Sequence, residues 1–297
     1  KLLTKKKAIS LDNYSRGNRF VKKFSKNICT NIQNKKKIIE VIRRYKIETI
    51  IHLASFTCVR ESKKKPNIYK KNNFINQITF LNQIVKLGVK KIIFSSSYSA
   101  QGFNKNNSVN FSPYAKYKFL LEKYLETVSK NQNIKVIVLR YPNVAGSSSD
   151  GTLGERNDKI TRIFPTFFKN ITKNKTTTIY YDFKTKTFPF RNYIHVEDIA
   201  RLNLLATHYI KKMKKNYLLI NINNKKRFSN KDIFDLMSKK LKKGKFIIKK
   251  ISKFEKTKPL YINDTKQLNK LMWKPKKSSI EKIINSNIKW YRRILHN

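Results

Sequence analysis

Lys91-Ile92-Ile93-Phe94-Ser95-Ser96-Ser97 is an apolar run that ends in three serines, and it is followed by the stretch Ser112-Pro113-Tyr114-Ala115-Lys116-Tyr117-Lys118. The first stretch is typical of a buried strand, and the proline of the second is favoured in the first turn of a helix. Residues four apart lie on one face of a helix, so Tyr114 and Lys118 are expected to be neighbours. The pattern therefore predicts a hydroxyl, a phenol and an ammonium at one site.

These three groups fit acid-base chemistry on a hydroxyl. A fixed ammonium favours the phenolate form of tyrosine, so Tyr114 becomes a usable general base near neutral pH. Ser97, at the carboxyl end of the strand, would hold the substrate hydroxyl whose proton Tyr114 removes. Tyr180 and Lys184 have the same spacing, but residues 176–182 are typical of strand and loop. The predicted secondary structure around each pair, and not the spacing, therefore favours Tyr114 and Lys118 as the candidate site.

The surrounding pattern predicts a doubly wound α/β fold. Strand-like runs alternate with helical patterns, which indicates β-α-β units and a parallel sheet whose ligands bind at the carboxyl ends of its strands. Asp12, Ala54, Ser97 and residues 141–143 all fall at such ends. The strands are expected at 8–11, 49–53, 89–94 and 134–139, and the helices at 35–45, 68–87 and 113–129, followed by helices near 162–171, 196–211, 229–242 and 279–294.

The net charge of +51 over 297 residues invites a nucleic-acid interpretation. The charge is almost all Lys spread along the chain, however, which favours compositional bias over a specific nucleic-acid site. Cys29 and Cys58 are isolated, so neither a disulfide framework nor a metal site is predicted. No apolar stretch reaches the length of a membrane span, and the start lacks a secretory signal. We expect a reduced, cytoplasmic protein without a membrane or specific nucleic-acid partner.

Five stretches in order resemble the extended short-chain dehydrogenase/reductase (NAD-dependent epimerase/dehydratase) family, closest to its UDP-glucose 4-epimerase group. They are 11–17 (LDNYSRG), 51–55 (IHLAS) with Glu61-Ser62, 94–97 (FSSS), 139–146 (LRYPNVAG) and 191–198 (RNYIHVED). The resemblance implies a Rossmann-like NAD-binding domain at 1–146. A smaller substrate-binding lobe is implied at 147–297, with some segments returning to the first domain.

The resemblance also implies where NAD would bind. A carboxylate such as Asp12 that ends the second strand of such a fold binds the ribose hydroxyls and selects NAD. The glycine-rich phosphate loop should lie roughly 20 residues earlier, upstream of Lys1. We therefore expect a fragment of a longer protein rather than a decayed one that binds NAD poorly. The implied NAD contacts are Asp12, Asn13, Asn31, Ile32, Leu53, Ala54, Ser55, Thr57, Asn73, Tyr114, Lys118 and Pro142.

The implied reaction is inversion at carbon 4 of a UDP-hexose through a transient 4-keto sugar. Tyr114 takes the 4-hydroxyl proton, Ser97 polarises the same oxygen and Lys118 holds the nicotinamide ribose and tunes Tyr114. The family usually has Asp at Asn31, Lys at Thr57, Asn or His at Arg162 and Arg at Lys253. The implied substrate contacts are Ser97, Tyr114, Asn143, Arg162, Ile179, Tyr180, Tyr181, Arg191 and Lys253.

Three alternatives stay open. A related dehydratase normally has acidic residues where Tyr98 and Ser99 stand, which weighs against dehydration. A UDP-glucuronate epimerase is the second alternative. A non-catalytic relic or a basic binding protein is the third alternative. The family usually pairs two subunits through the helices at 68–87 and 113–129, so the resemblance implies a homodimer.

Overall fold

The computed structural model describes residues 8–16, 26–101, 111–155, 162–224, 226–250 and 264–295. The chain divides into two compact units that are discontinuous in sequence. Unit 1 consists of residues 1–141, 201–222 and 262–273, and unit 2 consists of residues 142–200, 223–261 and 274–297. Each unit has its own core, so each is described separately.

Unit 1 is built on parallel sheets. Its four-stranded sheet has the order β3-β4-β5-β9, and every neighbouring pair is parallel. β1 and β2 form a separate parallel pair. This arrangement is the predicted α/β, Rossmann-like class. The strands are β1 (Ile9–Asp12), β2 (Lys26–Cys29), β3 (Thr49–His52), β4 (Lys91–Ser97), β5 (Lys135–Tyr141) and β9 (Tyr217–Asn221).

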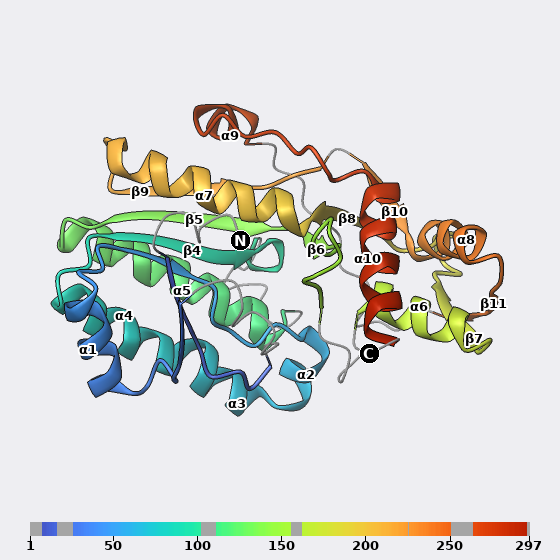
Figure 1. Ribbon diagram of the computed structural model, residues 1–297, viewed down its shortest axis with the longest axis horizontal. Helices are drawn as coiled ribbons and strands as arrows, with labels where there is room; N and C mark the ends of the chain where they lie inside the picture. The colour runs from blue at the N-terminus through green and yellow to red at the C-terminus, as the bar shows by residue number, and fades with distance from the viewer. Residues whose placement is uncertain are drawn as a thin grey trace. The chain divides into compact units, whose positions relative to one another are not determined.

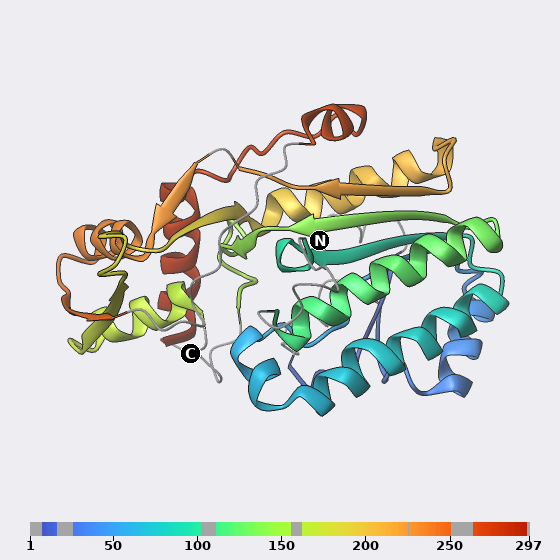
Figure 2. The ribbon, with the colours of Figure 1, turned by 180° about the vertical axis from the view of Figure 1, so that it is seen from behind.

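Helices cover both faces of the four-stranded sheet, as Figures 1 and 2 show: α1, α4 and α5 lie on one face and α7 on the other. Apolar side chains of α1, α4 and α5 pack on the buried residues of β4 and β5. Both faces are therefore covered, which suits the continuous apolar run at Ile92 to Phe94. The helices of this unit are α1 (Lys35–Arg44), α2 (Val59–Lys64), α3 (Pro66–Lys70), α4 (Asn76–Lys86), α5 (Pro113–Asn131) and α9 (Thr265–Lys270), with α7 (Val196–Lys212) entering it from Arg201.

The helix predicted at 68–87 differs in one respect. α3 begins at Pro66, and one π-helical turn, Lys71–Ile75, separates it from α4. Such a turn inserts an extra residue into the helix and often marks a functional position. Here it directs the Asn73 side chain inward, where it is 1% exposed. The apolar periodicity predicts the helix but not this interruption.

In the described part of unit 2, two small sheets combine with α6, α8, α10 and the first turn of α7. One sheet has the order β10-β8-β6, and β11 pairs with β7. Its core gathers aromatic side chains such as Phe167, Phe234 and Tyr291. The elements are β6 (Asn143–Ala145), β7 (Thr176–Tyr181), β8 (Phe190–His195), β10 (Arg227–Ser229), β11 (Lys245–Lys250), α6 (Ile163–Thr172), α8 (Asn230–Leu241) and α10 (Ile280–Leu295).

Gly146 is required at its position in unit 2. Its φ is +90°, and a Cβ there would lie 2.8 Å from the buried His195 ring. Gly151, in the same unit, has φ +69°, but its Cβ would meet the flexible Lys289 side chain at 3.0 Å. Both Ala replacements strain the backbone by about 1–3 kcal/mol.

We expect Gly146→Ala to lower the free energy of unfolding by roughly 1–3 kcal/mol more than Gly151→Ala, because only the first overpacks a buried ring. Urea denaturation of both variants measures this difference. Equal losses would contradict the close packing of Gly146 on His195.

Candidate functional site

The carboxyl end of β4 and the first turns of α5 place the predicted catalytic side chains. Ser97 is the last residue of β4, and α5 begins at Pro113 after the Ser112 hydroxyl accepts a hydrogen bond from the Ala115 amide at 3.2 Å. Tyr114 and Lys118 are one turn apart on α5 and are 8% and 3% exposed. Tyr180, by contrast, lies on strand β7, so the predicted distinction between the two Tyr-Lys pairs is confirmed.

The Lys118 ammonium is fixed against β4. Its Nζ donates a hydrogen bond to the Ser95 carbonyl at 2.7 Å and lies 4.8 Å from the centre of the Phe94 ring. Burial lowers the pKa of this ammonium to about 8, and the Glu122 carboxylate opposes that shift. Lys118 therefore carries a buried, strongly held positive charge at neutral pH.

Ser97 has a defined local role. Its hydroxyl oxygen accepts hydrogen bonds from the Ser99 amide at 3.2 Å and the Ser99 hydroxyl at 2.9 Å. Ser97 thereby caps the amino end of the short helical turn Tyr98–Ala100. Ser97 is partly exposed, and because it accepts both of these bonds, its own hydroxyl hydrogen is available for a substrate oxygen.

The sequence interpretation missed a buried polar network behind Lys118. The Glu122 carboxylate accepts a hydrogen bond from the Ser96 hydroxyl and two from the Arg140 guanidinium, at 2.9 and 2.5 Å. Glu122 is 2% exposed and the Arg140 side chain 12%. A signal was present, because Glu122 follows Lys118 by four residues, as Lys118 follows Tyr114.

The predicted NAD contacts near Asp12 and Asn31 fall where two parallel strands end. Asp12 ends β1 and pairs in register with Cys29 of β2, just before Asn31 and Ile32. One Asp12 oxygen accepts the Tyr14 amide at 2.8 Å, and the Asn13 side chain accepts the Ser15 amide at 3.0 Å. The side chains of Asp12, Asn13 and Asn31 are exposed. The Asp-Asn pair therefore forms a turn and still presents a carboxylate outward.

Arg16 ties the segment after β1 to the segment after β3. It forms a bidentate pair with Glu61, at 2.5 and 2.8 Å, and its guanidinium lies 3.8 Å from the centre of the Phe56 ring. The Asn73 side chain holds Phe56 from the other side, through both the amide and the carbonyl of Phe56, at 2.9 and 2.8 Å. These contacts bring the two strand ends together. The Asn73 side chain therefore holds the backbone of the loop that follows β3.

The residues that follow β3 are open to a ligand. Leu53 is 60% exposed, which is unusual for a large apolar side chain at a strand end. Ala54 and Thr57 are exposed too, whereas the partly buried Ser55 hydroxyl donates to the Phe56 carbonyl at 3.3 Å. An exposed apolar side chain at the end of β3 and an exposed carboxylate at the end of β1 suit a ligand with apolar rings and sugar hydroxyls.

The predicted substrate contacts outside the catalytic group lie in unit 2, as does Pro142. Asn143 is exposed on β6 and donates to the Asn192 carbonyl at 3.2 Å. Arg191 lies on β8, and Arg162 pairs with Glu155 at 3.2 Å. Lys253 lies outside the described residues.

Strand β7 carries Ile179, Tyr180 and Tyr181. The Ile179 side chain is fully buried in the core of unit 2, so only its backbone can face a ligand. Tyr180 and Tyr181 are partly buried. A ligand along this strand would therefore meet the tyrosines and not the isoleucine side chain.

Both motif histidines are buried and hydrogen-bonded to neighbouring side chains. His52 is buried and pairs with the Gln77 side chain at 2.5 Å, and burial lowers its pKa to about 4. His195 is 1% exposed and hydrogen-bonds the Ser286 hydroxyl at 3.1 Å. Across the described residues, no group of three or more His, Cys, Asp or Glu side chains could hold a metal. In that same part of the chain, no helix is long and apolar enough to cross a membrane.

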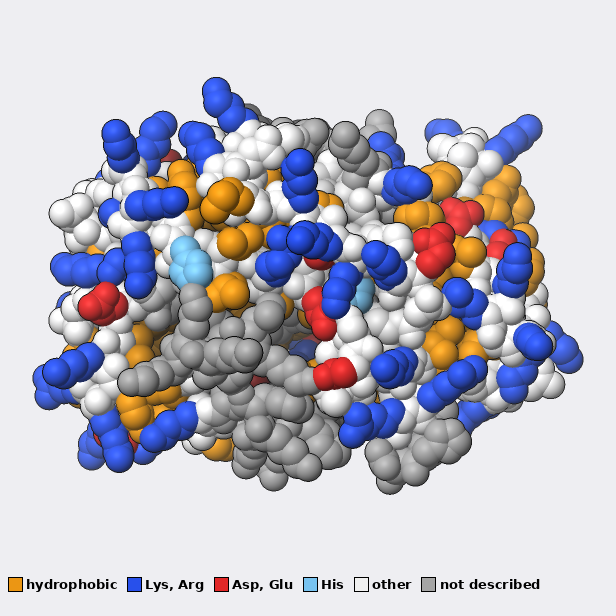
Figure 3. All heavy atoms as spheres, turned by 45° about the horizontal axis from the view of Figure 1, so that its top comes forward, with side chains coloured by type: hydrophobic (Ala, Val, Ile, Leu, Met, Phe, Trp, Pro, Cys, Tyr) orange, Lys and Arg blue, Asp and Glu red, His pale blue; other side chains and the backbone are white. Residues whose placement is uncertain are grey.

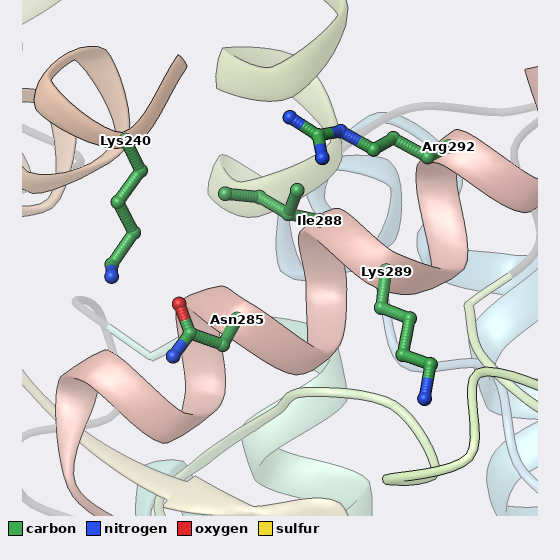
Figure 4. Close-up of a pocket in the computed structure, with 5 residues that line it drawn as sticks. All are labelled: Lys240, Asn285, Ile288, Lys289 and Arg292. Carbon is green, nitrogen blue, oxygen red and sulfur yellow. The ribbon is translucent and has the colours of Figure 1, made fainter. Parts of the chain in front are cut away.

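A cavity of about 460 Å³ lies on unit 2, away from every predicted site residue. Four of its lining side chains come from α10, and Lys240 comes from α8 (Figure 4). Its cations are exposed. Lys and Arg side chains are scattered over the whole face seen in Figure 3, so cations lining one cavity do not distinguish it.

The chain is similar to known proteins along most of its length. The model of the NAD dependent epimerase/dehydratase family matches residues 2–222. The UDP-glucose 4-epimerase of Lactobacillus helveticus is 31% identical over 268 residues, which cover 86% of this chain and 80% of that protein. The UDP-glucose 4-epimerase of Lacticaseibacillus casei is 32% identical over 264 residues, or 85% and 79% of the two chains.

A solved structure shares the fold. The crystal structure of the Bifidobacterium longum UDP-glucose 4-epimerase, in complex with NAD⁺ and UDP, matches with a TM-score of 0.87. The match covers 98% of this chain and 93% of that chain at 24% identity, which supports a common fold. With the family model matching most of the sequence and two relatives above 30% identity, the chain belongs to the NAD dependent epimerase/dehydratase family.

Proposed function

We propose that this protein inverts carbon 4 of a UDP-hexose, interconverting UDP-glucose and UDP-galactose with bound NAD. One observation carries the proposal: a buried Lys118 ammonium and Tyr114 share one helix face, next to the strand that ends in Ser97. The relatives named above are UDP-glucose 4-epimerases, which supports the same reaction here.

The residues of unit 1 fit NAD. Asp12 presents an exposed carboxylate to ribose hydroxyls, and a carboxylate at this position disfavours a 2′-phosphate. The exposed Leu53 offers an apolar surface beside the strand ends. Bound NAD would supply a reversible acceptor for the hydride from carbon 4. We propose that Asp12, Asn13, Asn31, Ile32, Leu53, Ala54, Ser55, Thr57, Asn73, Tyr114, Lys118 and Pro142 make up its site.

The side chains of this chain supply the acid-base steps. Tyr114, as the phenolate, accepts the proton of the sugar 4-hydroxyl and later returns it to the same oxygen. Ser97 donates a hydrogen bond to that oxygen. Lys118 stabilises the phenolate by its charge and holds the nicotinamide ribose. In unit 2, Asn143, Arg162, Ile179, Tyr180, Tyr181, Arg191 and Lys253 are the proposed contacts for the remaining parts of the nucleotide sugar.

Dehydration of the same substrate class is the competing reaction. It needs an acid that protonates a leaving hydroxyl, and Tyr98 and Ser99 occupy the positions after Ser97. Ser99 donates its amide and hydroxyl hydrogens to the Ser97 hydroxyl oxygen. Neither side chain is a carboxylic acid, which favours epimerisation.

The test is an assay of the full-length protein with NAD and either UDP-glucose or UDP-galactose. We expect both reactions to reach the same mixture of the two sugars, without loss of water. A product lighter by one water would establish a dehydratase instead. Absence of any conversion while NAD raises the melting temperature would favour a non-catalytic nucleotide-binding protein.

We also propose a homodimer that pairs through the surfaces of α3, α4 and α5. Ile68 and Ile75 support this, because they are 49% and 48% exposed on the α3 and π-helical segment. We expect the mass of a dimer in light scattering, and Ile68→Lys with Ile75→Lys should shift it to that of a monomer. A monomeric parent protein would contradict the proposal. The cytoplasmic setting stays a prediction.

A further inference from the structure

We propose that Glu122 is a positioning residue for the reaction: its buried carboxylate, locked by Ser96 and Arg140, keeps the Lys118 ammonium charged and in place. This inference rests on the proposed catalytic role of Lys118. It assigns a function to a network that the reaction itself does not touch.

The network is built from two strands and one helix. Ser96 of β4 and Arg140 of β5 are register partners, so their side chains lie on the same face of the sheet. Both reach Glu122 on α5, which covers that face. The Glu122 carboxylate is therefore fixed at three points in the interior of unit 1.

Each of the three serines at the end of β4 has a different structural role. The Ser95 carbonyl accepts the Lys118 ammonium at 2.7 Å, the Ser96 hydroxyl donates to Glu122, and Ser97 lies at the strand end. One strand thus holds both the ammonium and the anion that stabilises it. Because Tyr114, Lys118 and Glu122 follow at intervals of four, they share one face of α5.

The electrostatic need for this anion is clear. Lys118 is 3% exposed, and burial alone favours the neutral amine. A neutral amine would neither stabilise the Tyr114 phenolate nor hold ribose hydroxyls as a cation. Glu122 is the carboxylate that raises the pKa of Lys118 against this burial.

Three groups near this network have pKa values that burial moves away from the range between pH 6 and 9. On β3, His52 has a pKa lowered to about 4 by burial. On β5 and β9, burial raises the pKa of Tyr141 and of Tyr217. A change in this pH range therefore does not arise from these three groups.

The first test is the pH dependence of kcat/KM for Glu122→Gln. This variant keeps the shape of the side chain but removes its charge, and its amide nitrogen can no longer accept a hydrogen bond. We expect the alkaline limb of the profile to move down by about one pH unit. Glu126→Gln is the matched control. Glu126 lies one turn further along α5, and its side chain forms ion pairs with the exposed Lys123 and Lys130. The alkaline limb of the Glu126→Gln profile should not move.

Glu122→Gln could unfold the protein, because it leaves the Arg140 guanidinium buried without its anion. A second variant is therefore needed. Combining Glu122→Gln with Arg140→Met removes both charges, and such paired replacements are often well tolerated. This double variant should show a downward shift as well, but a smaller one, because loss of the Arg140 cation acts in the opposite direction. An unmoved limb in the folded double variant would overturn the proposal.

A readout without activity separates this inference from the proposed function. Titration of ε-¹³C-labelled lysine, with the Lys118 signal identified by its loss in Lys118→Met, gives the pKa of Lys118 directly. We expect a lower value in the double variant than in the parent. If the parent protein is inactive, the proposed function fails, and the titration still decides the role of Glu122. An unchanged Lys118 pKa would refute it.

Discussion

Tyr114→Phe is expected to reduce kcat for the interconversion of UDP-glucose and UDP-galactose by about 10²- to 10⁴-fold, the usual contribution of a general base. The substitution removes only the phenol oxygen, so the proton of the sugar 4-hydroxyl loses its acceptor. The ring itself stays in place, because Tyr114 packs with Tyr69 and Tyr117. Steady-state kinetics at pH 8 measure the loss.

Tyr117→Phe is the matched control. Tyr117 is equally buried, at 8% exposure, on the same helix, and its ring stacks on Phe74 at 5.8 Å between centres. This variant also loses one phenol oxygen, but at a position outside the proposed site. We expect it to keep the activity of the parent. Full turnover by Tyr114→Phe, or equal losses in both variants, would contradict the role of Tyr114.

Lys118→Met is expected to abolish activity and yet stabilise the chain at neutral pH. Burial lowers the pKa of Lys118 from 10.5 to about 8, so its charge costs roughly 3 kcal/mol in the folded state. Methionine removes that cost and loses the hydrogen bond to the Ser95 carbonyl, worth about 1 kcal/mol. We expect a net gain of roughly 2 kcal/mol in the free energy of unfolding at pH 7.

The sign of the pH dependence follows from the lowered pKa. Between about pH 8 and 10.5 the unfolded chain binds more protons than the folded one at this position, so stability rises with pH in that window. The cost of burying the ammonium is complete below pH 8 and absent above 10.5. The advantage of Lys118→Met should therefore disappear as pH rises through this range. Urea denaturation at pH 7 and pH 10.5 tests this, and a destabilised variant at pH 7 would contradict it.

The sequence predicted β1, β3, β4 and β5 of unit 1, but not the short strands β2 and β9. Apolar runs such as Lys91 to Phe94 have a length and a setting that only a buried parallel strand satisfies, and Ser112-Pro113 marks a helix start by a local capping rule. Local rules do not predict the π-helical turn at Lys71–Ile75. That turn depends on a tertiary contact, because Asn73 is turned inward to bind the Phe56 backbone.

The candidate site also contains some residues that the sequence predicts and others that it does not. Tyr114, Lys118 and Ser97 could be selected because their roles are encoded in spacing and in the strand-helix context. The spacing of four residues also points to Glu122. Its association with Ser96 and Arg140 could not be predicted, because it depends on the register of β4 with β5. Arg16 lies in the LDNYSRG stretch, and its pairing with Glu61 joins residues 45 positions apart. Long-range polar contacts of this kind leave no periodic signal in one sequence.

The central claim is that carbon 4 is oxidised and reduced again by the same hydrogen, at the Tyr114 site. Its most direct test uses UDP-galactose that carries deuterium at carbon 4, converted by the full-length protein in ordinary water. We predict that mass spectrometry and NMR will find the deuterium retained at carbon 4 of the UDP-glucose formed. Loss of the deuterium to solvent would show that the hydrogen leaves as a proton, and would contradict the account.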